Sequence, residues 1–159
     1  METDSSLNVN LGLKIEIIDK QLTLLPADGN YKYCFIFLHG LGMSVQKFFN
    51  VFLCEEMINL LADFKIVLPQ APIAPVTIEK RSTYSWFNIT ERTFGKPFDE
   101  IFGRQDIIDN GKFITELIDK EAKALGGDYS KVFLGGFSQG CAMALYVGLS
   151  IPQTLGGIV

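Results

Sequence analysis

The order of apolar and polar positions along the chain predicts several strands. Apolar and polar residues alternate over 13–17, and a second run with alternate apolar positions follows over 22–26. Two such runs so close together predict a two-stranded hairpin near a sheet edge. The segments 33–38 and 64–68 are mostly apolar, which is typical of strands buried on both faces.

Three other segments carry apolar residues at helical spacing. Ser44 can cap a helix that continues to about residue 61, and 139–150 is expected to form a helix rich in small residues. The strongest helical pattern runs over 104–125, and the glycine pair 126–127 ends it as a left-handed cap would. Its apolar stripe consists of Ile107, Ile108, Gly111, Ile114, Leu117, Ile118, Ala122 and Leu125.

Between these elements, 69–102 shows no sustained period and is expected to be a long loop without regular structure. Its aromatic residues argue against disorder, and unstructured segments of such length in compact domains are usually functional. Short strands are expected at 131–134 and 155–159. The order strand, helix, strand, loop, helix, strand, helix, strand predicts one α/β domain over 1–159 with a largely parallel sheet.

Composition narrows the classes of protein that this chain can represent. Its 159 residues include 14 Lys and Arg against 18 Asp and Glu, a formal net charge of -4, with no basic cluster to neutralise nucleic-acid phosphates. The apolar run over 33–38 is too short to span a membrane, and the N-terminus lacks the pattern of a secretory signal. Three cysteines without metal-ligand spacing and one histidine argue against a disulfide framework and a zinc site. We therefore expect a cytoplasmic protein without a nucleic-acid partner or an integral membrane segment.

A serine lies where the chain is expected to pass from a strand into a helix. Residues 136–140 form a G-x-S-x-G motif around Ser138, and in this context the spacing predicts a nucleophile elbow. Such a serine has a strained backbone with positive φ, and a Cβ at Gly136 or Gly140 would collide with the neighbouring strand and helix. Amide groups at the helix N-terminus would also favour a developing oxyanion. The alternative is a glycine-rich turn with an incidental serine.

A second turn supports the same chemistry. The segment His39-Gly40-Leu41-Gly42 directly follows the apolar run 33–38, where this kind of fold supplies the other backbone N–H of an oxyanion hole. The amides of Leu41 and Gln139 are therefore the expected oxyanion donors. His39 itself is expected to be a hydrogen-bonded structural residue, because α/β hydrolases place the catalytic histidine after the serine and the acid.

Four motifs resemble the acyl-protein thioesterase and phospholipase/carboxylesterase family of α/β hydrolases in order and spacing. They are F-L-H-G-L-G at 37–42, L-P-Q-A-P at 68–72 followed by P-V-T at 75–77, S-W-F-N-I at 85–89 and G-G-F-S-Q-G at 135–140. The resemblance runs from about Tyr33 to the end of the chain. It implies an α/β-hydrolase fold with a mostly parallel central sheet and helices on both faces. It also implies a cytoplasmic serine hydrolase, without a cofactor, that cleaves acyl thioesters or carboxylic esters.

The same resemblance assigns roles to single residues. It implies that Ser138 is the nucleophile, that the Leu41 and Gln139 amides form the oxyanion hole, and that Trp86 and Phe87 border an apolar acyl channel. The implied substrates are acylated proteins, including palmitoylated ones, and lysophospholipids or other carboxylic esters. Thioester and oxyester substrates both stay open, as does the oligomeric state.

The chain also departs from the family pattern. Met43 and Asn88 stand where the family usually has Asp, and Cys141 stands where a third glycine is common. No Asp, Glu or His follows Ser138, although the family's catalytic acid and base come later in the chain. We therefore expect the N-terminal two-thirds of the fold, lacking the last strands and helices and inactive alone, because a serine without a base is a poor nucleophile. The alternatives are a truncated paralogue that acts as a binding module, and a second chain that supplies the missing acid and base.

Overall fold

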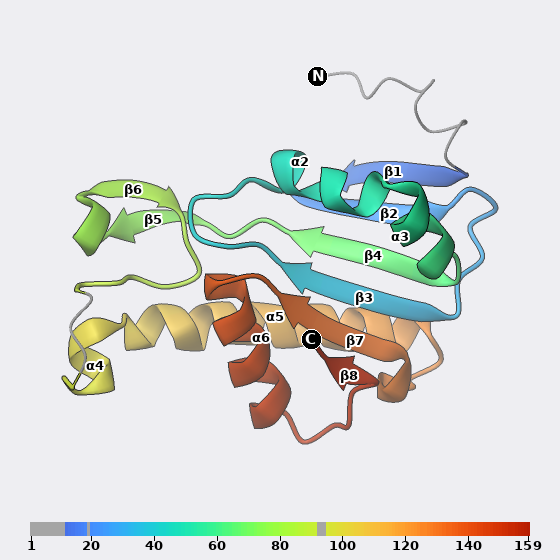
Figure 1. Cartoon of the computed structure of the whole chain (residues 1–159). Coiled ribbons are helices and arrows are strands. Elements are labelled where there is room, and N and C mark those ends of the chain that lie inside the picture. Colours follow the sequence, from blue (N-terminus) through green and yellow to red (C-terminus); the bar gives the residue numbers. More distant parts are fainter. Residues whose placement is uncertain (1–11, 19, 92–94) are drawn as a thin grey trace.

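A six-stranded sheet forms the centre of the structure (Figure 1). The structure is a computed structural model that describes residues 12–18, 20–91 and 95–159. The strand order is β1-β2-β4-β3-β7-β8. β1 and β2 form the predicted antiparallel hairpin at one edge, β2 pairs with β4 antiparallel, and β4, β3, β7 and β8 run parallel. The strands span β1 (Leu13–Ile18), β2 (Gln21–Pro26), β3 (Tyr33–Leu38), β4 (Phe64–Pro69), β7 (Val132–Gly136) and β8 (Gly157–Ile158).

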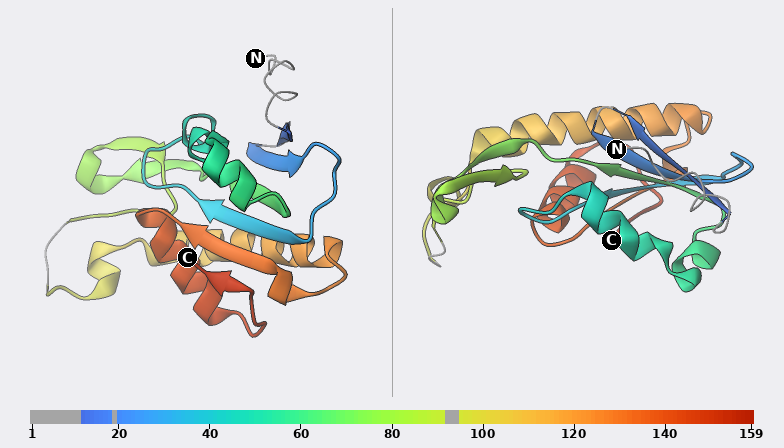
Figure 2. Two further views of the ribbon diagram at one scale, coloured as in Figure 1. Left: turned by 45° about the vertical axis from the view of Figure 1, so that its right-hand side comes forward. Right: turned by 90° about the horizontal axis from the view of Figure 1, so that it is seen from above.

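Helices cover both faces of this sheet, as predicted. On one face, α5 (Arg104–Ala124) and α6 (Gln139–Ser150) pack against the fully buried residues 34, 36 and 38 of β3. On the other face lie three short helices, α2 (Val45–Phe48), η1 (Phe49–Leu53) and α3 (Glu55–Leu60). Seen from above, α5 and the α2–α3 segment lie on opposite sides of the strands (Figure 2). The residues of β3 on this second face are only half-buried. The prediction that 33–38 is buried on both faces is therefore confirmed for one face only.

The prediction of one continuous helix from Ser44 to about residue 61 is wrong. The segment is broken at Cys54, whose backbone is extended with φ -75° and ψ 150°, and 49–53 has the tighter 3-10 geometry. The aromatic side chains explain the tighter winding. Phe48 stacks on Phe37 of the sheet at 5.4 Å between ring centroids, and Phe52 packs edge-on against Phe37 at 5.6 Å. Packing against the sheet thus overrides the helical period of the sequence.

The prediction of a structureless segment over 69–102 is also wrong. It contains the two-stranded antiparallel hairpin β5 (Ile73–Val76) and β6 (Arg81–Tyr84), joined by η2 (Thr77–Glu79), and then α4 (Phe98–Ile101). The turn places Lys80 in the left-handed region with φ 50°. A four-residue strand is too short to show an alternating pattern, and Pro75 within it argues against a central strand. Figure 1 shows this hairpin at the carboxyl ends of β3 and β4.

The helix α5 confirms the predicted stripe and adds one buried charge. Most members of the stripe are buried, and positive φ values at Gly126 and Gly127 end the helix as predicted. Glu121 is buried among them and pairs with Lys65 of β4 at 2.7 Å.

Within the described ranges, no helix combines the length and apolar character needed to cross a bilayer. A short 3-10 helix, η3 (Tyr129–Lys131), then leads into β7.

Candidate active site

The turn between β7 and α6 has the strained geometry that the G-x-S-x-G motif predicts. Ser138 is exposed and has φ 54° and ψ -117°, a conformation that costs a non-glycine residue about 1–3 kcal/mol. The two glycines are required by close approach. A Cβ on Gly136 would overlap the backbone of α6 at Gly140, and a Cβ on Gly140 would overlap the Leu38 carbonyl at the end of β3. The predicted reason for both glycines is thereby confirmed.

Backbone hydrogen bonds join this turn to the one after β3. The Phe137 N–H donates to the Leu38 carbonyl at 2.9 Å, and within the turn the Gly140 N–H donates to the Phe137 carbonyl at 2.9 Å. The two turns follow neighbouring parallel strands, since Leu38 is paired with Gly136. The predicted oxyanion residues, Leu41 and Gln139, therefore belong to adjacent turns at the same edge of the sheet.

The backbone N–H groups of Leu41 and Gln139 lack the hydrogen bonds that the N–H groups of Gly42 and Met43 make within the described part of the chain. The Gly42 N–H donates to the Tyr84 carbonyl at 2.8 Å, and the Met43 N–H donates to the Gly40 carbonyl at 3.2 Å. Neither the Leu41 N–H nor the Gln139 N–H donates to another residue in the described part of the chain. The Gln139 amide also begins the 12-residue helix α6, where the helix dipole favours negative charge.

His39 is a structural residue, as expected from its position before Ser138. It is 1% exposed, and its Nδ1 lies 2.8 Å from the Gly40 carbonyl, to which it donates. Its Nε2 accepts from the Ala71 N–H at 3.0 Å and from the Gln70 side-chain amide at 2.7 Å. Burial lowers the pKa of His39, although its hydrogen bond to Gly40 acts in the opposite direction. A neutral imidazole with both nitrogens bonded has no free atom with which to take a proton from Ser138.

Trp86 and Phe87, the predicted substrate contacts, lie in different surroundings. The Trp86 side chain is fully buried, and its Nε1–H donates to the His39 carbonyl at 2.8 Å. Phe87 is 6% exposed and lines an apolar pocket of about 200 Å³, together with Phe98, Phe102, Ile107, Ala142, Met143 and Tyr146. Phe87 is therefore better placed than Trp86 to meet an apolar group, and the substrate contacts of both stay predictions.

The departures from the family pattern lie around the site and not at Ser138. Met43 lines a pocket of about 480 Å³ beside the Leu41 turn, with Lys47 and Tyr84 among its other lining residues. Asn88 holds the β5–β6 hairpin, because its Oδ1 accepts from the Thr77 N–H at 2.8 Å. Cys141 is half-buried in the first turn of α6.

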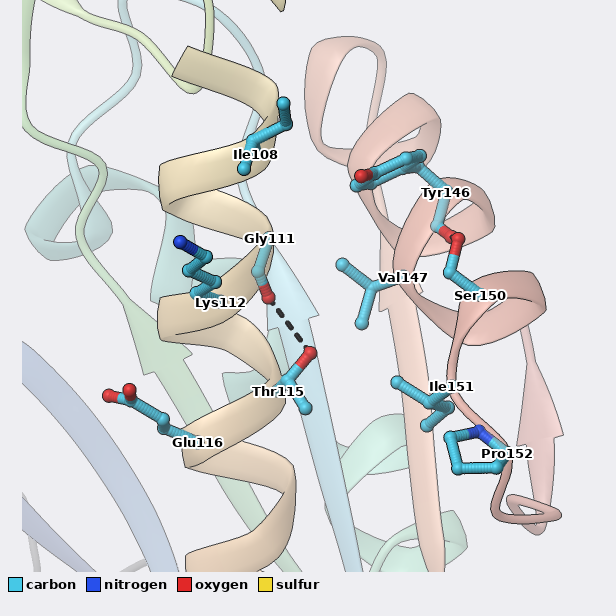
Figure 3. A pocket seen from close by; sticks show the side chains of 10 residues that line it. All are labelled: Ile108, Gly111, Lys112, Thr115, Glu116, Tyr146, Val147, Ser150, Ile151 and Pro152. Atoms are coloured by element: carbon cyan, nitrogen blue, oxygen red, sulfur yellow. Dashed lines mark hydrogen bonds between the residues drawn. The ribbon is translucent and has the colours of Figure 1, made fainter. Parts of the chain in front are cut away.

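Another groove, between α5 and α6, lies apart from these turns. Its volume is about 450 Å³, and Figure 3 shows Tyr146 and Val147 of α6 facing Gly111 and Thr115 of α5 across it. The dashed line there is the hydrogen bond from the Thr115 hydroxyl to the Gly111 carbonyl, 2.9 Å. No residue of 39–42 or 138–139 lines this groove.

Two features of the site were missed by the sequence analysis. The side chain of Gln139 is buried and hydrogen-bonded to Ser85, Trp86 and Phe87. Asp106 of α5 accepts from the Asn88 N–H at 2.9 Å. The available signal for Gln139 was a polar residue at the start of a helix whose next residues are small, because a buried polar side chain there needs hydrogen-bond partners. The described part of the chain contains no group of three or more His, Cys, Asp or Glu side chains that could hold a metal ion.

Comparisons with known proteins show the family. Residues 24–159 match the model of the Phospholipase/Carboxylesterase family. The acyl-protein thioesterase 1 of Schizosaccharomyces pombe is 38% identical over 128 residues, which cover 78% of this chain and 52% of that protein. The acyl-protein thioesterase 1 of Emericella nidulans is 31% identical over 139 residues, which cover 85% of this chain and 58% of that protein.

Solved structures show a similar fold. Arabidopsis thaliana SOBER1 matches with a TM-score of 0.63 at 32% identity, over 79% of this chain and 59% of SOBER1. The chain thus spans about half the length of the curated relatives it matches. The likeness to these structures and the mostly parallel sheet between helical layers confirm the predicted α/β-hydrolase fold. The chain belongs to the phospholipase/carboxylesterase family of α/β hydrolases.

Proposed function

We propose that Ser138 is the nucleophile of a cytoplasmic serine hydrolase that cleaves acyl thioesters or carboxylic esters. The observation that carries the proposal is the exposed, strained Ser138 in a turn beside that of Leu41, with the backbone N–H groups of Leu41 and Gln139 free of partners among the described residues. An acyl-transfer site needs this combination of a presented hydroxyl and pre-oriented oxyanion donors.

The proposed reaction follows from these groups. The Ser138 Oγ attacks the acyl carbonyl carbon, and the carbonyl oxygen becomes an oxyanion that accepts from the Leu41 and Gln139 amides. The thiol or alcohol leaves, and water then attacks the acyl-enzyme and releases the carboxylic acid, with no cofactor. Both steps require a base. Because His39 is fully bonded and no Asp, Glu or His follows Ser138, we place the base and the acid outside residues 1–159.

The proposed substrates are those that the relatives' names indicate. Acylated proteins are proposed from the acyl-protein thioesterases, phospholipids and carboxylic esters from the family description, and lysophospholipids from the resemblance of the four motifs. The apolar pocket lined by Phe87 and Met143 is proposed to hold part of the acyl chain, since nearly all of its lining is hydrocarbon or aromatic.

Added imidazole can test the role of Ser138 in the chain as it is. We expect negligible hydrolysis of a short-chain p-nitrophenyl ester by residues 1–159, because no base activates the serine. Imidazole supplies such a base from solution, so a protein-dependent rate is expected in its presence and should be lost in Ser138→Ala. The matched control is Ser150→Ala, which removes a hydroxyl bonded to the Tyr146 carbonyl at the far end of α6.

Three outcomes would contradict parts of this account. Equal imidazole-dependent rates for wild type and Ser138→Ala would show that Ser138 is not the nucleophile. Robust activity without imidazole that is abolished by Ser138→Ala would place a base within residues 1–159. No protein-dependent rate at any imidazole concentration would favour the binding module.

A further inference from the structure

One short segment is hydrogen-bonded to both turns of the proposed oxyanion hole. This segment, Tyr84 to Phe87, begins at the last residue of β6 and is called here the brace. Its Ser85 and Trp86 side chains are fully buried. The Phe87 side chain lines the apolar pocket, but the contacts of the brace with the two turns are hydrogen bonds that do not involve that side chain.

On one side, the brace is bonded to the turn after β3 both before and after Leu41. The Trp86 Nε1–H donates to the His39 carbonyl at 2.8 Å, and the Gly42 N–H donates to the Tyr84 carbonyl at 2.8 Å. The Leu41 amide lies between these two fixed points and is itself unbonded to the described residues. Its direction is therefore set by the peptide groups on either side, which the brace holds.

On the other side, the brace is bonded to the Gln139 side chain. The Gln139 Oε1 accepts from the Trp86 N–H at 2.8 Å, and its Nε2 donates to the Phe87 carbonyl at 2.7 Å and to the Ser85 Oγ at 3.1 Å. Both amide hydrogens and the carbonyl oxygen of this buried side chain are thus used. Since Gln139 also carries the second oxyanion amide, these bonds fix the residue that must present it.

The brace is in turn fixed to the body of the domain. The Ser85 N–H donates to the Pro72 carbonyl at 3.0 Å, and the Asn110 side-chain amide of α5 donates to the Trp86 carbonyl at 2.7 Å. A segment with such attachments can hold two separate turns at a constant spacing. The backbone bond from the Phe137 N–H to the Leu38 carbonyl already joins the two turns, and the brace adds contacts closer to the Leu41 and Gln139 amides.

We infer that the brace sets the relative position of the Leu41 and Gln139 amides, with Trp86 and the Gln139 side chain as positioning residues. The inference rests on the proposed function, because it assumes that these amides receive the oxyanion. Oxyanion donors must lie within about 2.7–3.1 Å of the position that the oxyanion will occupy, and a displacement of about 1 Å can cost about 100-fold in rate. Neither positioning residue needs to touch the substrate.

The test compares an ester with its thionoester, in which sulfur replaces the carbonyl oxygen. Sulfur is larger and a weaker hydrogen-bond acceptor, so a well-set oxyanion hole favours the ester. Both rates are measured with imidazole for wild type, for Trp86→Phe, which removes the indole N–H, and for Gln139→Met, which keeps the backbone amide. We expect the ester-to-thionoester ratio to fall about tenfold in both variants. A loss of folded protein would lower both rates equally and leave the ratio unchanged.

The controls separate this inference from the proposed function. Tyr129→Phe removes a hydrogen bond to Asp119, far from the brace, and should leave the ratio unchanged. If Trp86→Phe and Gln139→Met fail to fold, Ser85→Ala removes a hydroxyl that accepts from the Gln139 side chain and donates to the Phe87 carbonyl, and the same fall is expected. A ratio within twofold of wild type in the folded brace variants would overturn the inference. Loss of the Ser138 dependence of the rate would instead overturn the proposed function.

Discussion

The turns after β3 and β7 lie side by side at the carboxyl ends of paired strands, yet they are built in opposite ways. After β3, His39 is buried, and both of its ring nitrogens are hydrogen-bonded. After β7, Ser138 is exposed and has a strained backbone with positive φ. The first turn hides its polar side chain, and the second turn presents it.

The difference follows from what each turn is proposed to supply. A turn that supplies only a backbone N–H can bond its side chains fully, because the amide direction depends on the peptide groups alone. A turn that supplies a hydroxyl must keep that side chain free. Its shape then comes from backbone strain and from glycines that allow close approach, as at Gly136 and Gly140.

The largest effect is expected where the two turns touch. Gly140→Ala would place a Cβ against the Leu38 and His39 carbonyls, which belong to the backbone and cannot rotate away. We expect the free energy of unfolding to fall by about 3 kcal/mol, as measured by urea denaturation followed by circular dichroism. Gly126→Ala is the matched control, because Gly126 has φ +78° with no neighbouring atom within 4 Å, and it should cost about 1 kcal/mol. Equal losses would mean that close approach does not shape the second turn.

The next effect concerns the buried histidine of the first turn. Burial holds the pKa of His39 below its ordinary value of 6.5 in the folded chain. Below about pH 6.5 the unfolded chain therefore binds the proton more readily, and stability falls as the pH decreases, by at most about 1.4 kcal/mol per pH unit. Asp28 and Asp128, whose pKa values are lowered by hydrogen bonds from Asn30 and Ser130, lose their stabilising effect only at lower pH.

His39→Gln isolates this contribution, because the sequence contains a single histidine. Urea denaturation of both proteins between about pH 7.5 and 5.5 should show a fall for wild type and a flat profile for the variant. The same slope in both would mean that His39 titrates alike in the folded and unfolded states.

A smaller effect should report the strain at Ser138. Ser138→Gly and Ser138→Ala both lose the hydroxyl, so their difference isolates the backbone. Relief of positive φ by glycine outweighs its extra entropy in the unfolded chain, and we expect the Gly variant to be more stable by about 1 kcal/mol. In the last turn of α6 the order should reverse, with Ser150→Ala more stable than Ser150→Gly. The same order at both positions would contradict a strained elbow.

The turns were predictable from sequence because their requirements are local. The glycines around Ser138 and the H-G-L-G turn mark backbone shapes that few other residues adopt. The brace was not predictable in the same way, because the partners of the Gln139 side chain lie 52 to 54 positions earlier in the chain. The break at Cys54 was missed for a different reason, since no Gly or Pro marks it and packing of the neighbouring aromatics decides the local winding.

An effect no larger than that at Ser138 is expected from Gly42→Ala, in the first turn. Gly42 has φ +73°, but a Cβ there would lie 3.6 Å from the Thr83 hydroxyl, an ordinary contact. Only the left-handed backbone then opposes the substitution, so the loss in urea denaturation should be about 1 kcal/mol, and Gly42→Asn should lose less because Asn tolerates this region. A loss as large as that of Gly140→Ala would mean that close packing shapes the first turn as well, and that the two turns differ only in the side chain they present.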